Sequence, residues 1–521
     1  MYLHLDSEKV IIGEPTTYPV YVFSQFFIHK DEERNKEIQF CLLTNILNPL
    51  IEKVYLLNER EYTYKEMGLQ MDYPKVIQIV TGRRLRYSDI FLNVNLLKLE
   101  GYIVAHNIDI FFDDTIKMLP KTDLHERKMI MALLRWEYSG PNKDVKLFGP
   151  RADSQDTWIY HSKWNENFMK YLRAFNFEFG MPGCDNSIAY IFKLLDFGLV
   201  NDPELIHTLH YHKTQIRDYT NKDRIKMPYA MICPAGAENP IKPDVTLDEC
   251  NILHDFIKNA REPYLIPRIS GMEAICACFP SKINQPAMKN NAGVQISNAQ
   301  SCKKWCKEYL KAFENCSMYG GWGKNNEDLV YRGIESAHIE IEYICEGKPR
   351  FWSHCLDVFD QIERRAWTLG LAGKRILIVS SFAKSMREKL PYLDKIYGKD
   401  IFPNCTFQFI IPPQTHASNP SREWDIELDE FYEKLDKVTD YDVALVSAGG
   451  NGNLICNHIY ETGHSAIYVG GVLQMFFGLL GGRWLDERSA IVRMYLNEYW
   501  SRPKEEEQPK DYKKIEGGCY W

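Results

Sequence analysis

The chain has 521 residues, 45% of them hydrophobic and 26% charged, with a formal net charge of −7. This composition is that of an ordinary globular protein and excludes collagen, coiled-coil and disordered classes. Because acidic and basic residues are interspersed and the net charge is negative, no broad cationic face is predicted, and nucleic acid is not an expected partner.

The length exceeds what a single hydrophobic core usually supports, so two domains are predicted. Residues 1–10 carry charges where a signal peptide needs an apolar core, and the longest apolar stretch, residues 466–480, is too short and too interrupted by glycine to span a bilayer. The fourteen cysteines are scattered singly apart from Cys276 and Cys278, which favours reduced thiols. A cytoplasmic protein without a membrane span is therefore expected.

The first half of the chain alternates apolar runs with charged, helical stretches. In chain order it predicts a strand at residues 18–28, a helix at 31–47, strands at 53–57 and 75–80, a helix at 87–99 and a strand at 102–106. This alternation is typical of a nucleotide-binding α/β sheet, in which ligands lie beyond the carboxyl ends of the parallel strands. Asp109 follows the last of these strands.

The second half begins after a proline-rich segment, residues 219–263, that has no hydrophobic period. We predict one domain at residues 1–235, a linker at 236–262 and a second domain at 263–521. Strands are predicted in the second domain at residues 375–381, 442–447 and 465–469, and the last two run into glycines. Strands that end in glycine turns indicate a second Rossmann-like sheet.

Asp109 is the best candidate for a metal ligand in the first half. A diphosphate leaving group gathers negative charge, and Mg²⁺ or Mn²⁺ held by a carboxylate at a strand end stabilises that charge. The alternative is that Asp109, Asp113 and Asp114 cap the helix that follows, because aspartate is common at helix N-termini. We favour capping for Asp113 and Asp114, and metal binding for Asp109.

Arg83, Arg84 and Arg86 lie in the turn between a predicted strand and a predicted helix. Guanidinium groups and free helix amides suit diphosphate oxygens, so the turn is predicted to contribute to nucleotide binding. A solvated basic turn is the alternative. Ser24 and Gln25, at the end of the first predicted strand, are placed to line the pocket for the base.

Four segments of the first half together resemble a family of bacterial and viral glycosyltransferases of the GT-A type. They are residues 107–113, 133–136, 148–158 and 179–186, and the likeness covers most of residues 18–219. It implies a metal and nucleotide-sugar site like the Asp-x-Asp region of that family. Asn107 takes the place of the first acid, which leaves Asp109 as the main metal ligand.

The same resemblance implies a catalytic base. Asp185 opens a helix after a glycine-rich turn and stands where such enzymes place the acid that accepts the hydroxyl proton of the acceptor. A plain helix N-cap is the alternative for Asp185. Asp153 and Asp156 are then the next candidates for the base.

Three histidines, His207, His210 and His212, lie close together near the end of the first predicted domain. A histidine late in GT-A domains often completes the metal coordination, so the resemblance implies that His210 or His212 joins Asp109 as a ligand to Mn²⁺. A lone histidine is usually structural, but three in this short run favour the metal site.

Residues 268–273, with the sequence Arg-Ile-Ser-Gly-Met-Glu, resemble the Arg-x-Gly-Asp-Gly-Glu opening of the GT-D type of glycosyltransferase. Gly271 stands where that family has its metal-binding Asp, so the resemblance leaves Glu273 as the catalytic acid. Gly449, Gly450 and Gly452 are predicted to let backbone amides approach a phosphate. Tight turns in an inert fold are the alternative for these glycines.

These features predict an α/β protein with a GT-A-like mixed sheet followed by a GT-D-like parallel sheet. The predicted function is transfer of a sugar from a nucleotide-diphosphate sugar to a glycan acceptor hydroxyl, with Mn²⁺ or Mg²⁺ in the first domain and a second transferase activity as an extension. One alternative is a single active domain beside a catalytically silent sugar- or acceptor-binding module. Another is nucleotidyl transfer, which would need more carboxylates around the metal.

Overall fold

The computed structural model describes residues 2–141, 143–217, 219–225, 228–237, 249–322, 334–358, 362–363, 365–487 and 489–521. The chain forms two compact units. Unit 1 comprises Met1–Pro243 and Glu487–Met494, and unit 2 comprises Asp244–Asp486 and Tyr495–Trp521. Within the described ranges, every helix is too short or too polar to cross a membrane.

Unit 1 is built around a seven-stranded mixed sheet in the order β11-β7-β10-β5-β2-β3-β4. Its strands are β2 (Val20–Ser24), β3 (Lys53–Asn58), β4 (Val76–Val80), β5 (Tyr102–His106), β7 (Met129–Leu133), β10 (Thr157–His161) and β11 (Gly198–Val200). Strands β2 to β5 are parallel, and β10 is antiparallel to both β5 and β7. The carboxyl ends of β2 to β5 therefore share one edge of the sheet.

Two smaller sheets complete the strands of unit 1. One has the order β6-β12-β8-β9, and the other pairs β1 with β13. Their strands are β1 (Tyr2–Leu5), β6 (Ile110–Phe112), β8 (Trp136–Glu137), β9 (Lys146–Leu147), β12 (Thr208–His210) and β13 (Tyr229–Ile232). Because β6 follows β5 directly, the four-stranded sheet lies against the carboxyl edge of the large sheet.

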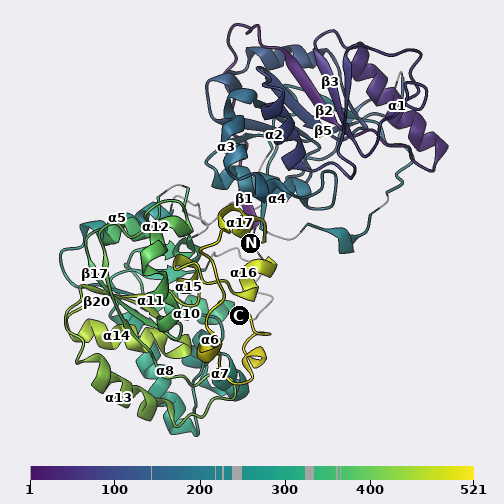
Figure 1. Ribbon diagram of the computed structural model, residues 1–521. Coiled ribbons are helices and arrows are strands. Elements are labelled where there is room, and N and C mark those ends of the chain that lie inside the picture. Colours follow the sequence, from purple (N-terminus) through teal and green to yellow (C-terminus); the bar gives the residue numbers. More distant parts are fainter. Residues whose placement is uncertain are drawn as a thin grey trace. The chain divides into compact units, whose positions relative to one another are not determined.

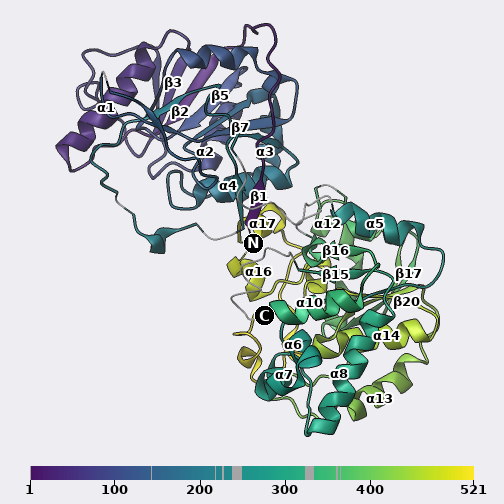
Figure 2. The ribbon, with the colours of Figure 1, turned by 180° about the vertical axis from the view of Figure 1, so that it is seen from behind.

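The helices of unit 1 are α1 (Glu32–Leu47), α2 (Tyr87–Leu96), α3 (Asn165–Lys170) and α4 (Cys184–Leu194), with α17 (Ser489–Tyr495) from the later segment. Figures 1 and 2 show the central strands between α1 on one side and α2 and α3 on the other. In α1, Ile38, Leu42 and Ile46 recur at helical spacing and are buried. Asp31 caps this helix by accepting a hydrogen bond from the Arg34 N–H at 2.9 Å.

Unit 2 has a parallel sheet in the order β14-β20-β19-β17-β18, and β15 pairs with β16. The strands are β14 (Leu265–Ile266), β15 (Tyr319–Gly321), β16 (Arg350–Trp352), β17 (Arg375–Ser380), β18 (Thr406–Ile410), β19 (Val443–Ser447) and β20 (Ser465–Tyr468). Strands β17, β19 and β20 are buried almost throughout, as expected for parallel strands covered on both faces.

Helices cover both faces of the unit 2 sheet. The helices of this unit are α5 (Glu249–Asn259), α6 (Met272–Cys278), α7 (Gln285–Asn290), α8 (Ala299–Glu314), α10 (Glu335–Ile344), α11 (Ala383–Lys389), α12 (Leu393–Ile396), α13 (Trp424–Leu435), α14 (Gly452–Glu461), α15 (Leu473–Phe476) and α16 (Gly482–Glu487). In Figures 1 and 2, α8, α13 and α14 lie on one side of β17 and β20, and α5 and α12 lie on the other.

The α/β class predicted from the sequence is confirmed, with a mixed sheet in unit 1 and a parallel sheet in unit 2. The first predicted strand, residues 18–28, is shorter in the structure and covers only Val20–Ser24. Helix α5 lies within residues 236–262, where a linker is predicted, and it belongs to unit 2. Residues 238–248 of that predicted linker lie outside the described residues.

Candidate functional site

Asp109 lies in the turn between β5 and β6. The turn is closed by the Ile110 N–H, which donates to the Asn107 carbonyl at 3.0 Å. Asp109 is only 7% exposed, although it follows the carboxyl end of β5, where the chain leaves the sheet. A buried carboxylate needs compensating partners, because an unpaired charge in the interior is costly.

Pairing of β6 with β12 brings two histidines to Asp109. His210 pairs with Ile110, and the Tyr211 N–H donates to the Asp109 carbonyl at 2.9 Å. His210 Nε2 lies 3.3 Å and His212 Nδ1 lies 3.6 Å from Asp109 Oδ2. One ligand atom from each of Asp109, His210 and His212 lies within 4.8 Å of the other two, so this buried group can hold a metal ion.

The outer nitrogen of each imidazole has its own partner. His210 Nδ1 lies 3.1 Å from Glu137 Oε2, and His212 Nε2 lies 3.0 Å from the Ile216 carbonyl. Metal-binding histidines commonly hold their second nitrogen in this way, which fixes the ring with the other nitrogen toward the metal. Asp109 Oδ1 is buried, and no hydrogen-bond partner for it lies among the described residues. These donors fit Mn²⁺ or Mg²⁺ through the carboxylate, and the imidazoles favour Mn²⁺.

The charged residues of this group shift one another's pKa values. Burial alone would raise the pKa of Asp109, but His210 and Arg34 hold that pKa well below its usual range. Burial alone would lower the pKa of His210, but Asp109 and Glu137 raise it to about 9. Burial and the positive charge of Arg34 lower the pKa of His212 to about 4, which keeps that ring neutral. A metal ion bound by His210 would therefore displace a proton from that ring.

Arg34 is a second cation at Asp109 that sequence reasoning does not identify. It lies in the first turn of α1, is buried, and pairs with Asp109 Oδ2 and with Glu37 at 2.9 Å. Its guanidinium lies at Oδ2, the carboxylate oxygen that His210 Nε2 and His212 Nδ1 also face, so a metal ion held by these three residues would compete with Arg34. No local pattern marks Arg34, since it reaches Asp109 from a helix far away in the sequence.

A chain of ionic contacts links His210 to the loop before β10. Arg135 Nε lies 2.7 Å from Glu137 Oε1, and Arg135 Nη1 lies 2.6 Å from Asp156 Oδ2. Asp156 Oδ1 accepts from the Asn107 side-chain amide at 3.0 Å. The structure thus brings the predicted residues Asn107 and Asp156 together and adds Arg135 and Glu137. Arg135 directly precedes β8 and Glu137 lies in it, and this alternate spacing in extended chain, which places both side chains on one face, is the signal that would identify them.

Asp185 lies in the first turn of α4, next to this network. The residue that caps α4 is Gly183, at φ +76°, so Asp185 is not its N-cap. Asp185 Oδ2 accepts from the Gln155 N–H at 3.3 Å. Burial, with a further contribution from the Asp156 carboxylate, raises the pKa of Asp185 to about 7. A carboxylate with this pKa is suited to accept a proton near neutral pH.

The three predicted arginines have different partners. Arg83 forms two bonds to Asp89, at 2.8 and 2.7 Å, and Arg86 donates to Asn176 at 2.8 Å. Arg84 donates to the carbonyls of Phe179 and Gly180 at 3.2 and 3.3 Å.

Arg84 and Asn107 meet at Gly180. A Cβ atom added to Gly180 would lie 2.9 Å from Asn107 Oδ1 and 3.5 Å from Arg84 Nη2. Of the three predicted arginines, Arg84 is thus the one placed beside Asn107.

Ser24, Gln25 and Asp153 have local partners. The buried Ser24 hydroxyl donates to the His106 carbonyl at 2.9 Å. The Gln25 amide donates to the Arg83 carbonyl and accepts from the Leu85 N–H, both at 3.0 Å, which holds the basic turn against β2. Asp153 pairs with Arg151 through bonds of 2.7 and 2.8 Å.

In unit 2, the predicted phosphate-binding glycines are packed against other groups. A Cβ atom added to Gly449 would lie 2.4 Å from His416 Nε2, and one added to Gly452 would lie 2.1 Å from the Tyr468 ring. The Gly450 N–H donates to the Ala292 carbonyl at 2.8 Å. The space that these glycines leave is therefore filled by the protein itself. Glu273 lies in the first turn of α6. Burial raises the pKa of Tyr309 and Tyr468, and the nearby Glu273 carboxylate raises both pKa values further.

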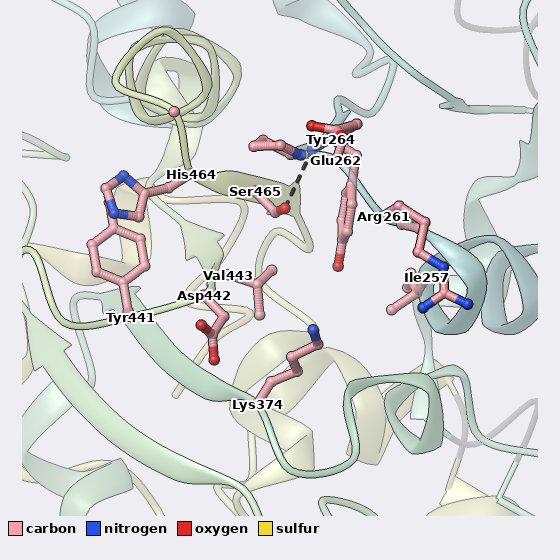
Figure 3. A pocket seen from close by; sticks show the side chains of 13 residues that line it. Ile257, Arg261, Glu262, Tyr264, Lys374, Tyr441, Asp442, Val443, His464 and Ser465 are labelled. Atoms are coloured by element: carbon pink, nitrogen blue, oxygen red, sulfur yellow. Dashed lines mark hydrogen bonds between the residues drawn. The ribbon is translucent and has the colours of Figure 1, made fainter.

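A pocket of about 240 Å³ lies elsewhere in unit 2 (Figure 3). It is lined by the residues at which β14, β17, β19 and β20 begin, so it lies at the amino edge of the parallel sheet, opposite to the glycines. Asp442 is paired with Arg375 at 2.7 Å, and His464 stacks on Tyr441 with ring centroids 4.3 Å apart. Ligands of parallel sheets bind at the carboxyl edge, so this pocket is not the candidate site.

A scan against protein-family models and a search of curated proteins give no match for this chain. A glycosyltransferase from Streptococcus sanguinis with domain of unknown function 1792 is similar in structure, with 12% identity, 50% of this chain and 94% of that chain covered, and a TM-score of 0.30. A mannosyltransferase from Pyrobaculum calidifontis, solved with GDP-Man and Mn²⁺, is also similar in structure. The match has 12% identity and a TM-score of 0.26, and it covers 39% of this chain and 60% of that chain. Likeness at these TM-scores does not assign a function, which depends on the side chains described above.

Proposed function

We propose that unit 1 is a glycosyltransferase domain that binds a nucleotide-diphosphate sugar at the carboxyl edge of its sheet and transfers the sugar to a glycan acceptor hydroxyl. The observation that carries this proposal is the buried group of Asp109, His210 and His212 at the end of β5, linked by ionic contacts to Asp156 beside Asp185. It combines a site for a divalent cation with a carboxylate of raised pKa.

Asp109, His210 and His212 would hold Mn²⁺ or Mg²⁺ in this domain. When bound, such an ion stabilises the negative charge that develops on a departing diphosphate. Glu137 and the Ile216 carbonyl orient the two imidazoles, and Arg34 balances part of the Asp109 charge. Without a cation, Arg34 and a protonated His210 keep this buried carboxylate paired.

Arg84 and Asn107 are the side chains that we assign to the nucleotide-sugar donor. Both lie at Gly180, whose missing side chain lets the polar ends of Asn107 and Arg84 approach the turn closely. Arg84 is exposed and carries a charge that suits a diphosphate oxygen. Asn107 is held in place by Asp156 at 3.0 Å. Arg83 and Arg86 support this turn through their own partners.

Asp185 is the residue that we assign as the general base. A group that takes the acceptor proton in the transition state contributes roughly 10²–10⁴-fold in rate, and its pKa should lie near the working pH. A pKa of about 7 meets this condition. Transfer with retained anomeric configuration would not need this base, since the leaving phosphate takes the proton there.

The alternative proposal, one active domain beside a catalytically silent module, is favoured by one observation in unit 2. The space beside the glycines after β19 is filled by His416, Ala292 and Tyr468, and the N–H groups of Gly450 and Gly452 already donate to the carbonyls of Ala292 and Gly449. Unit 2 would then bind sugar or acceptor rather than a nucleotide. A second transferase activity would need its donor site around Arg268 and Glu273 instead.

Isothermal titration of UDP- and GDP-sugars, with and without Mn²⁺, tests the proposal. We expect the wild-type chain to bind one donor with Mn²⁺ and His210→Ala to lose this Mn²⁺-dependent binding. His207→Ala is the matched control, because His207 belongs to the same run of histidines but pairs with Asp113 at 2.9 Å outside the metal group. Equal binding by wild type and His210→Ala would reject the metal assignment, and no binding of any sugar nucleotide by the wild type would reject the function.

A further inference from the structure

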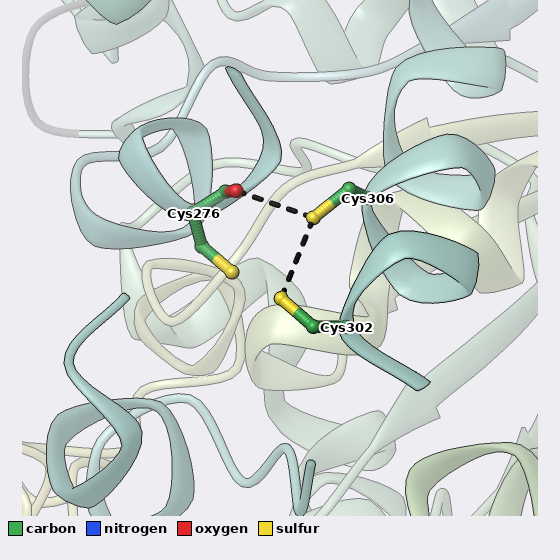
Figure 4. Close-up of side chains that lie close together, drawn as sticks. All are labelled: Cys276, Cys302 and Cys306. Atoms are coloured by element: carbon green, nitrogen blue, oxygen red, sulfur yellow. Dashed lines mark hydrogen bonds between the residues drawn. The ribbon is translucent and has the colours of Figure 1, made fainter. Parts of the chain in front are cut away.

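Three buried cysteines of unit 2 lie together between two helices (Figure 4). Cys276 comes from α6, and Cys302 and Cys306 come from α8. Cys302 and Cys306 are four residues apart, so they share one face of α8, and that face packs on α6. Their exposed fractions are 1%, 6% and 5%.

The three sulfur atoms are spaced as the ligands of one metal ion would be. Cys302 Sγ and Cys306 Sγ are 3.9 Å apart, and all three Sγ atoms lie within 4.8 Å of one another. A zinc–sulfur bond of about 2.3 Å places sulfurs around a shared ion about 3.8–4.0 Å apart, in tetrahedral or trigonal geometry. The observed spacing therefore needs little adjustment to admit an ion.

Unit 2 has a second close pair of thiols, and comparing it with the group of three shows the importance of the third sulfur. Cys316 Sγ and Cys345 Sγ are also 3.9 Å apart and buried. Among the described residues, no third ligand joins that pair, whereas Cys276 completes a group of three around Cys302 and Cys306. Buried cysteine often serves only as a small apolar side chain, and the second pair fits that role.

We propose that Cys276, Cys302 and Cys306 form a three-thiolate site for a thiophilic closed-shell metal ion, Zn²⁺ or Cu⁺. Soft thiolate ligands select such ions over Mg²⁺ or Mn²⁺, so this site differs in chemistry from the group around Asp109. Each cysteine that binds as a thiolate loses one proton.

The bound ion would fasten α6 to α8. Glu273 lies in the first turn of α6, so the ion would also fix the helix that carries this residue. The role of the ion is therefore structural, since its ligands lie in the hydrophobic core of unit 2.

Metal retention by the full chain tests this site. Asp109→Ala/His210→Ala serves as the parent protein, so that the group in unit 1 does not contribute. The parent is loaded under reducing, anaerobic conditions with Zn²⁺ or with Cu⁺, passed through a desalting column, and analysed for metal by mass spectrometry. We expect one equivalent of one of the two ions to be retained and the melting temperature to rise, because binding to the folded state stabilises it. The ion that is retained decides between zinc and copper.

Cysteine variants in the same parent locate the ion. Cys302→Ser and Cys276→Ser should each lose the retained equivalent and the rise in melting temperature, whereas the matched control Cys345→Ser should keep both. If circular dichroism shows that a serine variant is unfolded, Cys302→Ala replaces it, since alanine adds no buried hydroxyl. No retained ion in the parent, or full retention by both cysteine variants, would overturn the proposal.

Discussion

At the carboxyl edge of the unit 1 sheet, strand β5 leads into charged side chains, whereas β19 of unit 2 leads into glycines. The turn after β5 carries Asp109, which meets His210 and Arg34 below the surface. The turn after β19 carries Gly449, whose neighbouring space is filled by His416. The turn after a strand at the carboxyl edge thus gathers charged side chains in unit 1 and is closely packed in unit 2.

This difference teaches how a glycine after a strand should be interpreted. Glycine permits close approach of any group, whether a phosphate or a side chain of the protein itself. At Gly180 of unit 1 the neighbours are polar groups, Asn107 and Arg84, whereas at Gly452 of unit 2 the neighbour is the Tyr468 ring. The identity of the neighbouring atoms, rather than the glycine, distinguishes the two cases.

The largest expected effect is on turnover in unit 1. Asp185→Asn should lower kcat by roughly 10²–10⁴-fold and leave donor affinity unchanged, because the amide cannot accept the proton. Steady-state kinetics with a competent acceptor measure the rate, and titration measures affinity. Near-normal turnover would assign Asp185 to structure, and lost donor binding would place it on the nucleotide side of the site.

Stability of the same variant should depend on pH. The pKa of Asp185 is about 7 in the folded chain, against about 3.9 for an exposed aspartate. Between these values the folded protein holds an extra proton, so wild-type stability falls as the pH rises from about 4 to about 7. Asp185→Asn should therefore gain stability relative to wild type across this window, as measured by thermal unfolding at several pH values. If the difference in stability between Asp185→Asn and wild type did not change with pH, the raised pKa of Asp185 would be contradicted.

The next largest expected effect is on Mn²⁺ binding, through Glu137, the residue that orients His210. Glu137→Gln should weaken Mn²⁺ binding by about 10–100-fold, the usual cost of losing a partner that orients a metal ligand. Mn²⁺ titration in the presence of donor measures the change. Asp153→Asn is the control, since Asp153 pairs with Arg151 outside the network. Equal Mn²⁺ affinity in Glu137→Gln and wild type would remove Glu137 from the site.

In unit 2 the expected effect is on stability alone. Gly452→Ala places a Cβ atom against the Tyr468 ring and should cost about 1–3 kcal/mol through overpacking, without changing donor binding in unit 1. Gly271→Ala is the matched control, because its nearest neighbour would lie 3.9 Å away. Chemical denaturation measures both. If Gly452→Ala were as stable as wild type but bound sugar nucleotides differently, this result would indicate a phosphate site beside Gly452 in unit 2.

The smallest effect expected is a shift in a pH profile. The Asp156 carboxylate contributes to the raised pKa of Asp185, so Asp156→Asn should move the acid limb of kcat/KM from about pH 7 to lower pH. The rate should then be less sensitive to acid, although its maximum also falls because Arg135 and Asn107 lose a partner. An acid limb at the wild-type position would exclude the influence of Asp156.

Local sequence patterns predicted most of the framework and some of the site. Apolar runs marked β3, β4 and β5, and the position of Asp109 after β5 followed from them. Arg34 was not predicted, because it reaches Asp109 from a distant segment and no local period reveals that contact. Glu137, which contacts His210, was not predicted either, although its alternate spacing with Arg135 is a local signal.

The predicted linker shows the same limit. Its prolines, Pro240 and Pro243, lie outside the described residues, and α5 begins after them at Glu249 and packs against residues 367–371, more than a hundred positions further on. The helix itself contains neither proline nor glycine, so a composition averaged over the longer segment concealed it.

Pairing of β1 with β13 has a consequence for the order in which unit 1 folds. β1 is synthesised more than two hundred residues before its partner, with Tyr2 opposite Tyr229, and β13 packs on α4, the helix that carries Asp185. Closing so long a loop is entropically costly, so this pairing is expected late in folding. During refolding, protection of backbone amides from hydrogen exchange should therefore appear first in β2 and β5 and last in β1. The surface of the helix that carries Asp185 would then be completed among the final events in the folding of unit 1.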